Sequence, residues 1–430
     1  MWALFSLLFS FVIILVSPQP QQPQQPLLAA GRSFLMPDDT WRREAIKTLW
    51  EERQKMIYTP LFKFNYPGLP TVDLIFKNET ASRTETLKHR YAWALMMWAL
   101  VEGHIGPNTT VYEASSGNTA ASLAFMCQLV KVRFIAVCPD TLEDKKFAHI
   151  TKYGANIQKA PNAKRWNVAQ EMAASSNGFF MNQFGNADKA EEFHESGTYS
   201  LESVNVFHEF LAQLDADPNQ LVKQPDYFIM PVGTGGTLSS VGKYVKKYGI
   251  ATRIIFADTQ YSLMGDYAFS GRFSNVSGQN FVISPGMAGI GTLPTGIAVK
   301  GKTTSLDRGV IDRVMKIPDM ASTAAMGVLQ RLGINGGTSS GVNFVAMLSI
   351  AANEASKDPH PRLTLSTLLA DPGTFYTASY LNRTWINEEM AAHGGLLAYD
   401  CWRDVLENIL QVGGDPLVIG IQRCQSAAIF

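Results

Sequence analysis

Short apolar runs alternate with amphipathic stretches along most of the chain. The runs that we interpret as buried strands are Val72–Phe76, Arg133–Cys138, Tyr227–Val232, Arg253–Ala257 and Leu363–Leu369. Between them, helical periodicity is found at Ala120–Val130, Asp144–Tyr153 and Thr237–Tyr248. Strands that alternate with helices form parallel sheets with crossover helices, so the pattern predicts an α/β fold. In such sheets, ligands bind at the carboxyl ends of the strands.

The first residues follow a different pattern. The stretch MWALFSLLFSFVIILVS is apolar throughout and is followed by PQPQQPQQP. This run is short for a membrane span and suits the apolar region of a secretory signal, although no Lys or Arg precedes it. An uncleaved anchor with an extended Pro/Gln stalk is the alternative. We expect a secretory-pathway protein, secreted or membrane-anchored, that touches a membrane only through this segment if it is not cleaved.

Length and charge narrow the class of protein. The chain has 430 residues, more than one core usually serves, so two domains are expected. Lys+Arg 37 against Asp+Glu 37 gives a net charge of +0, which argues against a nucleic-acid partner.

The four cysteines show no metal-binding spacing, and we predict no metal site. Cys127 and Cys138 stand in apolar surroundings typical of core thiols. Cys401 and Cys424 could pair in an oxidising compartment or remain two free thiols. Sequons that permit glycosylation in a secreted protein begin at Asn78, Asn108, Asn275 and Asn382.

A glycine-rich turn follows one of the predicted strands. The residues are Gly233, Thr234, Gly235, Gly236 and Thr237, and a predicted helix begins directly after them. Backbone N–H groups at such a helix start can bind an anion, or the turn can bind nothing. A nucleoside triphosphate is disfavoured because no Lys follows Gly236, and a dinucleotide because Leu238 replaces the third glycine. Asp258, at a strand end, keeps a nicotinamide cofactor as a remote alternative.

Two more segments carry candidate chemistry. One supplies hydroxyl, amide and backbone N–H groups at a helix start, as a helix cap or as a carboxylate site; it comprises Ser115, Ser116, Gly117, Asn118 and Thr119. The other begins an amphipathic helix with Lys88. That side chain is either a solvated lysine or a half-buried amine of lowered pKa that can form a Schiff base.

These segments together resemble a known family, that of cysteine synthase and cystathionine β-synthase, with the tryptophan-synthase-β type of fold (fold type II). The similar stretches occur in the family's order: YTPLFKFN (58–65), TLKHR (86–90), EASSGNTAASLA (113–124), NQFGNADKAEEFHESGTYSLE (182–202), PVGTGGTLSSVGKYVK (231–246), GIG (289–291) and GINGGTSSG (333–341). The chain resembles a divergent member, because several family positions are changed.

The resemblance implies two three-layer αβα domains with mostly parallel sheets. After a signal or anchor with its linker (1–30), an N-terminal segment (31–84) would pack partly on the larger domain. A smaller mobile domain (85–190) would carry the carboxylate loop, and a larger domain (191–395) would carry the phosphate-binding turn. A helical extension (396–430) would follow.

The resemblance also implies roles for residues. Pyridoxal 5′-phosphate would be bound through its phosphate by Gly233, Thr234, Gly235, Gly236 and Thr237, with Gly291 nearby. Lys88 would be the Schiff-base lysine, and Asn118 would contact the cofactor's 3′ oxygen. The substrate carboxylate would be received by Ser115, Ser116, Gly117, Asn118, Thr119 and Gln183.

One departure concerns the cofactor's ring nitrogen. The family's serine partner aligns with Pro372, which has no side-chain donor or acceptor. Asp371 is adjacent and could turn in to replace it, as an acidic partner would make a stronger electron sink. A second departure is Ser196–Thr198, where the family has TTG.

The activity implied is β-elimination or β-replacement on serine, an O-activated serine or cysteine, with Lys88 as the catalytic residue. The partner would be a small amino-acid substrate, and a homodimer is possible. A degenerate cofactor-binding sensor or partner protein is the alternative that Pro372 favours. A nicotinamide-dependent oxidoreductase is the remote alternative.

Overall fold

The computed structural model describes residues 37–56, 58–162, 164–191, 205–271, 285–291, 305–357 and 362–425. Contacts group the chain from Pro37 onward into one compact unit that contains two sheets. The described strands are β1 (Leu61–Phe64), β2 (Val72–Asn78), β3 (Thr110–Ala114), β4 (Arg133–Pro139), β5 (Asn156–Ala160), β6 (Gly178–Phe180), β7 (Tyr227–Met230), β8 (Arg253–Thr259), β9 (Arg313–Ile317) and β10 (Leu363–Leu369).

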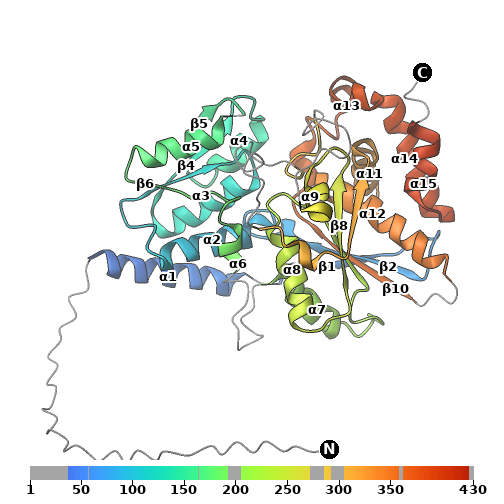
Figure 1. The fold of residues 1–430 in the computed structure, drawn as a ribbon, viewed down its shortest axis with the longest axis horizontal. Coiled ribbons are helices and arrows are strands. Elements are labelled where there is room, and N and C mark those ends of the chain that lie inside the picture. Colours follow the sequence, from blue (N-terminus) through green and yellow to red (C-terminus); the bar gives the residue numbers. More distant parts are fainter. Residues whose placement is uncertain are drawn as a thin grey trace, which may run out of the picture. The chain divides into compact units, whose positions relative to one another are not determined.

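Helices connect and cover these strands (Figure 1). They are α1 (Pro37–Lys55), α2 (Lys88–Val101), α3 (Asn118–Val130), α4 (Asp144–Thr151), α5 (Arg165–Ala174), α6 (Ala187–Glu191), α7 (Val206–Ala216), α8 (Gly236–Lys247), α9 (Met264–Ser270), α11 (Asp319–Arg331), α12 (Thr338–Ala355), α13 (Arg383–Glu389), α14 (Gly395–Val412) and α15 (Pro416–Gly420). The five predicted strands and three predicted helices are all confirmed, with small differences at their ends.

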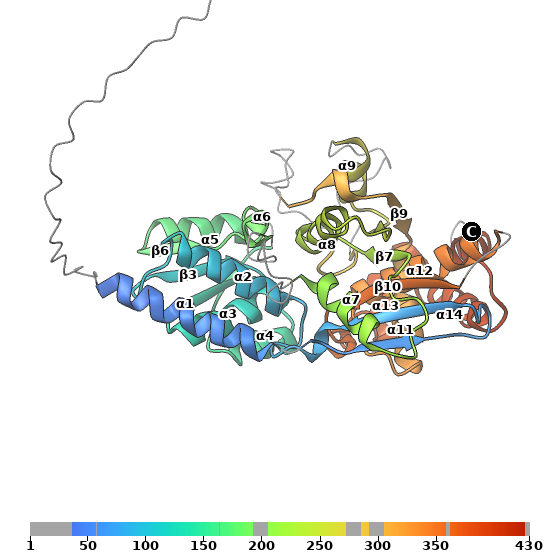
Figure 2. The same cartoon turned by 90° about the horizontal axis from the view of Figure 1, so that it is seen from below.

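The smaller sheet has the strand order β5-β4-β3-β6, and all its described pairs are parallel. Helices α1, α2 and α3 pack their apolar side chains on one face, and α5 covers the other with Ala169 and Ala173. Helix α2 is buried from Tyr91 to Leu100, as expected of a helix that is apolar all round. Trp93 Nε1 donates to Leu49 O at 2.7 Å, which fixes α1 along α2 (Figure 2).

The larger sheet has the order β1-β2-β10-β7-β8-β9, in which β1 alone is antiparallel to its neighbour. Helices α11, α12 and α14 form the core on one face, and α7, α8 and α9 on the other. All seven residues of β10 are buried, as in central strands of parallel sheets covered on both faces. The predicted pair of three-layer αβα arrangements is therefore confirmed.

The N-terminal segment that we assigned to 31–84 is divided between the two sheets. Helix α1 packs with α2 and α3, whereas β1 and β2 extend the larger sheet. The other domain boundaries remain predictions, because both sheets belong to one compact unit.

The predicted helical extension begins with α14, whose Trp402 and Leu406 join the core of the larger sheet. Cys401 and Cys424 form a disulfide, which decides between the two alternatives left open by the sequence. Cys127 and Cys138 are buried free thiols, as predicted. Within the described ranges, none of the helices is long and apolar enough to cross a membrane.

Candidate active site

Lys88 is positioned by the connection between β2 and α2. Leu87 N donates to Ala370 O at 2.7 Å, and this bond holds the start of α2 against the carboxyl end of β10. Lys88 N donates to Thr86 Oγ1 at 2.8 Å, which satisfies one of the free N–H groups of the helix start. The lysine therefore lies where the strands of the larger sheet end.

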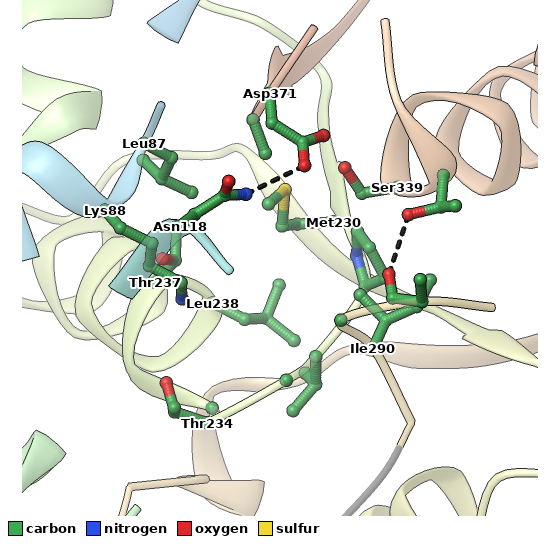
Figure 3. A pocket seen from close by; sticks show the side chains of 18 of the residues that line it. Leu87, Lys88, Asn118, Met230, Thr234, Thr237, Leu238, Ile290, Ser339 and Asp371 are labelled. Atoms are coloured by element: carbon green, nitrogen blue, oxygen red, sulfur yellow. Dashed lines mark hydrogen bonds between the residues drawn. The ribbon is translucent and has the colours of Figure 1, made fainter. Parts of the chain in front are cut away.

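A cavity opens at this edge of the sheet. Its empty volume, including the part that is open to solvent, is about 590 Å³. Loops after β3, β7 and β10 and the start of α12 contribute to it (Figure 3). Its described lining residues are Leu87, Lys88, Asn118, Met230, Pro231, Val232, Gly233, Thr234, Gly235, Thr237, Leu238, Ala288, Gly289, Ile290, Thr338, Ser339, Ala370, Asp371 and Tyr376.

Among the described residues that line this cavity, Lys88 is the one with a cationic side chain. Burial lowers the pKa of its amine to about 8, although the charge of Asp371 acts in the opposite direction. The Nζ atom lies 5.2 Å from the centre of the Tyr91 ring. Roughly a tenth of the amine is therefore unprotonated and nucleophilic at about pH 7, far more than for a free lysine.

The glycine turn forms another part of the cavity wall. Gly235 has φ +93°, a conformation that glycine adopts without strain, and α8 begins directly after it. A Cβ at Gly233 would lie 2.7 Å from Gly289 O, so two backbone segments approach closely here. Thr234 is buried, and its Oγ1 accepts from Gly236 N at 3.4 Å. Backbone N–H groups at such a helix start can bind an anion.

Gly236 and Gly291 were both expected in the cofactor site, and the structure places them differently. Gly236 lines an adjoining cavity together with Lys88, Thr234 and Thr237. Gly291 is not among the described lining residues of either cavity; its N–H donates to Val232 O at 2.8 Å. Its φ of +72° is a conformation that favours glycine, and its predicted place near the cofactor stays a prediction.

Asp371 points into the cavity. Its Oδ2 accepts hydrogen bonds from Asn118 Nδ2 at 2.8 Å and from Tyr376 OH at 2.6 Å, and the first is drawn in Figure 3. Burial raises the pKa of its carboxyl group, and the hydrogen bonds from Tyr376 and Asn118 oppose that shift. Pro372 is buried but is not among the described lining residues. The acidic residue, and not the aligned proline, thus faces the cofactor site.

The loop Ser115–Thr119 connects β3 with α3. Asn118 reaches the main cavity, whereas the other residues of this loop and Gln183 are not among its described lining residues. Thr119 Oγ1 donates to Gln183 Oε1 at 2.7 Å, so these two predicted substrate-binding residues do meet. Arg165 Nη1 donates to Ser116 Oγ at 3.2 Å, and Cys138 Sγ donates to Ser115 O at 3.2 Å.

Thr338, Ser339 and Tyr376 also line the cavity, although they are not among the predicted site residues. Thr338 Oγ1 donates to Ala288 O at 2.8 Å. Ser339 Oγ is buried in the cavity wall without a hydrogen-bond partner among the described residues. The signal was present in GGTSSG, a second glycine turn before a helix. The changed motif at 193–198 lies outside the described residues.

Asp258, the reason for the nicotinamide alternative, has an internal role. Its Oδ2 accepts from Gly265 N at 2.8 Å and from Lys316 Nζ at 2.7 Å. It is buried and is absent from the described lining of the cavity, so it does not offer a ribose contact there.

The described residues fit pyridoxal 5′-phosphate. The glycine turn supplies N–H groups for a phosphate, and Lys88 supplies an amine for an aldehyde. Asp371 and the unpartnered Ser339 hydroxyl supply polar groups for the ring. The apolar side chains of Leu87, Leu238 and Ile290 are also in the wall.

Comparison with known proteins agrees with this chemistry. The family described as "Pyridoxal-phosphate dependent enzyme" matches residues 53–362. Over 394 residues, the chain is 47% identical to "Putative pyridoxal-phosphate dependent protein F13B12.4" of Caenorhabditis elegans, covering 90% of each chain. It is 29% identical over 356 residues to L-cysteine desulfhydrase Cds1 of Mycobacterium tuberculosis, covering 81% of this chain and 90% of the relative.

A solved structure shares the fold. The crystal structure of O-ureido-L-serine synthase superposes with a TM-score of 0.61 at 22% identity, covering 78% of this chain and 94% of that chain.

Proposed function

The chain belongs to the family of pyridoxal-phosphate dependent enzymes, and from that premise we propose that it catalyses β-elimination or β-replacement on serine, an O-activated serine or cysteine. The observation that carries the proposal is the position of Lys88. Its half-buried amine, with a pKa of about 8, shares one cavity with the glycine turn and Asp371. Relatives named L-cysteine desulfhydrase and cysteine synthase B support this reaction class.

Pyridoxal 5′-phosphate supplies an electron sink for reactions at the carbon atoms of a bound amino acid. In our proposal, the N–H groups of Gly233–Thr237 hold its phosphate and Asn118 orients its 3′ oxygen. Lys88 would hold the aldehyde group, and its amine would take the proton from the α-carbon of the substrate. The carboxyl group of Asp371 would place a negative charge near the pyridine ring of the cofactor or form a hydrogen bond with it.

The substrate carboxylate is assigned to the loop Ser115–Thr119 and to Gln183. These groups would fix the Cα–H bond of the amino acid toward Lys88, which lowers the entropic part of the barrier. The leaving group on the β-carbon then departs. With cysteine and one molecule of water, the products are sulfide, pyruvate and ammonia.

The decisive experiment measures sulfide and pyruvate release by the purified cofactor-loaded protein with L-cysteine, and product formation from O-acetyl-L-serine with a thiol. Turnover at roughly 1–10³ s⁻¹ is usual for enzymes and is expected here. Lys88→Ala should abolish it, whereas Lys159→Ala, which removes an exposed lysine from β5, should not. No turnover with either substrate would contradict the proposal.

Borohydride reduction tests the role of Lys88 independently of turnover. Reduction should fix the cofactor to Lys88 in a peptide map of the wild-type protein. A label on a different lysine would refute the assignment.

Pro372 favours a second candidate function, that of a cofactor-binding sensor or partner protein with little catalysis. A buried proline stands where the family has a serine. For a sensor, an amino acid should change the cofactor's absorbance while no product forms. The same assay therefore separates the two candidates.

We also propose a homodimer and routing through the secretory pathway. Light scattering that shows a monomer would contradict the dimer.

The Cys401–Cys424 disulfide and the apolar N-terminal run support the routing through the secretory pathway. Asn108 is exposed, whereas the amide oxygens of Asn78 and Asn382 cap helices. In a secreting eukaryotic cell, Asn108→Gln should remove a glycosidase-sensitive mass; a protein of unmodified mass would count against the routing.

A further inference from the structure

Three buried side chains form a chain of hydrogen bonds beneath the carboxylate loop. They are Glu113 in β3, Gln183 after β6 and Thr119 in α3. Glu113 Oε2 accepts from Gln183 N at 3.1 Å, and Glu113 Oε1 accepts from Gln183 Nε2 at 3.1 Å. Gln183 Oε1 in turn accepts from Thr119 Oγ1 at 2.7 Å. Glu113 was not among the residues that the sequence singled out.

This arrangement uses the donors that a substrate carboxylate would need. Thr119 has one hydroxyl proton, and it is directed at Gln183. The side-chain amide of Gln183 is directed at Glu113, with a longer contact of 3.4 Å to Ala114 O. While these bonds persist, Thr119 offers the substrate only its lone pairs.

We propose that Glu113 is a proton-linked positioning residue, which decides whether the Thr119 hydroxyl can donate to the substrate carboxylate. The inference rests on the proposed function, because it concerns the binding of that substrate.

Protonation of Glu113 would reverse the hydrogen bonds of Gln183, and the single proton that Glu113 takes up is the only one exchanged with solvent. When Glu113 Oε1 takes up a proton, its O–H must donate, and the group facing it must become an acceptor. Rotation of the Gln183 side-chain amide by half a turn presents Oε1 to Glu113 and Nε2 to Thr119 Oγ1. The positions of the amide oxygen and nitrogen therefore depend on the hydrogen bonds that their neighbours offer. Thr119 then accepts, and its hydroxyl proton is free for the substrate. The 3.4 Å contact to Ala114 O is lost, which favours the unturned amide when Glu113 is ionised.

The surroundings of Glu113 allow this proton uptake near neutral pH. Burial raises the pKa of Glu113 to about 7, against the effect of the hydrogen bonds from Gln183 and the Ala114 backbone and of the charge of Arg165 on α5. On β4, burial raises the pKa of the Cys138 thiol to about 12, so that group stays neutral. On α2, the Tyr91 hydroxyl donates to Gln183 O and holds the backbone in place.

Glu113→Gln imitates the protonated form. The Gln183 N–H requires an oxygen opposite it, so the new amide must present its NH₂ group to the Gln183 side chain. The variant should hold Thr119 in its donating state at every pH. Glu171→Gln, an exposed change of the same kind on α5, is the matched control.

The measurement is the dissociation constant of L-alanine, which has no β-leaving group, from the change in cofactor absorbance between about pH 5.5 and about pH 8.5. The ratio of wild type to variant cancels the ionisation of the ligand's amine. We expect a ratio near one at the acid end that begins to rise near the pKa of Glu113 and reaches roughly 30 at the alkaline end. The control should give a ratio near one throughout.

A ratio that does not change with pH overturns the inference and leaves the proposed function intact. If L-alanine changes the absorbance of none of the proteins, the proposed function falls and the inference falls with it. Thr119→Val gives a second test, because it lacks the hydroxyl. It should lose affinity at the acid end and show no pH dependence of this origin, and retained affinity would overturn the inference.

The protonation of buried Glu113 can also be tested without cofactor, by chemical unfolding of the apoprotein at several pH values. In the wild type, the folded Glu113 holds its proton to higher pH than the unfolded one, so this residue's contribution to stability declines from about pH 4.5 to about pH 7. The stability of Glu113→Gln relative to wild type should therefore rise over that range. A constant difference would contradict the buried proton.

Discussion

Asn118 Nδ2 donates a 2.8 Å hydrogen bond to Asp371 Oδ2, and this bond joins the loop after β3 to the carboxyl end of β10. Tyr376 OH donates to the same oxygen at 2.6 Å. Gly337 N donates to the Asp371 backbone oxygen at 2.9 Å, so the residue is held from three sides. Asp371 therefore has a fixed orientation toward the cavity that contains Lys88.

Asp371→Asn should lower turnover by roughly 10²-fold, because an amide cannot provide the negative charge that a buried carboxylate keeps near the cofactor. Cofactor content should change little, since the glycine turn and Lys88 remain. The measurement is kcat for sulfide release together with the cofactor-to-protein ratio. Turnover within a factor of about two of wild type would show that Asp371 has no part in the reaction.

Pro372→Ser is the comparison for that variant. From the sequence, this change is expected to restore the family's ring partner and raise elimination. The structure favours a different outcome, because Pro372 is not among the described lining residues of the cavity and precedes the short helix Gly373–Tyr376. We expect turnover within about twofold of wild type, and a large gain would mean that position 372 reaches the ring. The free energy of unfolding must be measured alongside, since the loss of proline loosens the unfolded chain.

The rate at which the apoprotein takes up pyridoxal 5′-phosphate should rise with pH through about 8 and then level off. The reason is that only the unprotonated amine of Lys88 attacks the aldehyde, and its pKa is lowered to about 8 by burial. Asp371 raises that pKa, so Asp371→Asn should move the midpoint to lower pH. The rate is followed by cofactor absorbance, and a midpoint near the value for a free lysine, roughly 10.4, would contradict the burial.

Gly235→Ala and Gly236→Ala should differ in stability although they are neighbours. Gly235 has φ +93°, and a Cβ there would meet the Leu306 backbone at 2.8 Å. The first change should cost at least 1–2 kcal/mol, roughly the penalty of the left-handed conformation. At Gly236 the nearest atoms to a Cβ lie at 3.6 Å and 3.8 Å, which is ordinary contact. Urea unfolding of the apoproteins compares them, and equal stabilities would refute the steric argument. A substitution at Gly235 is therefore unsuited to testing phosphate binding alone.

Replacement of both Cys401 and Cys424 by serine should lower the free energy of unfolding by about 3 kcal/mol, from the entropy of closing the loop between them. Their separation is 23 residues, and Cys424 is buried against the C-terminal helices. Thermal unfolding of wild type with and without reductant gives the same comparison, with Lys88 and its cavity unchanged. Identical melting temperatures for the oxidised and reduced forms would indicate that the pair does not form in solution.

The sequence by itself determined the local elements and the candidate chemistry. Strand β10 could be recognised because a central strand is buried on both faces and is therefore apolar along its length. Lys88 and the turn Gly233–Thr237 could be recognised because a lysine at a helix start and a glycine-rich helix start each imply a specific chemistry. These are short-range features, and they are determined by residues that are neighbours in the chain.

Only the tertiary structure decided which of these features meet. Asn118 and Asp371 are separated by 253 positions and touch although they follow strands of different sheets. The carboxyl end of β10 also meets Leu87, next to Lys88, because β10 inserts between β2 and β7. That strand order is a matter of long-range packing, which the pattern of apolar residues along the chain does not specify. The same reason applies to Glu113. In the sequence it is one polar residue in a buried strand, and its bond to Gln183 exists only because β3 and β6 pair side by side.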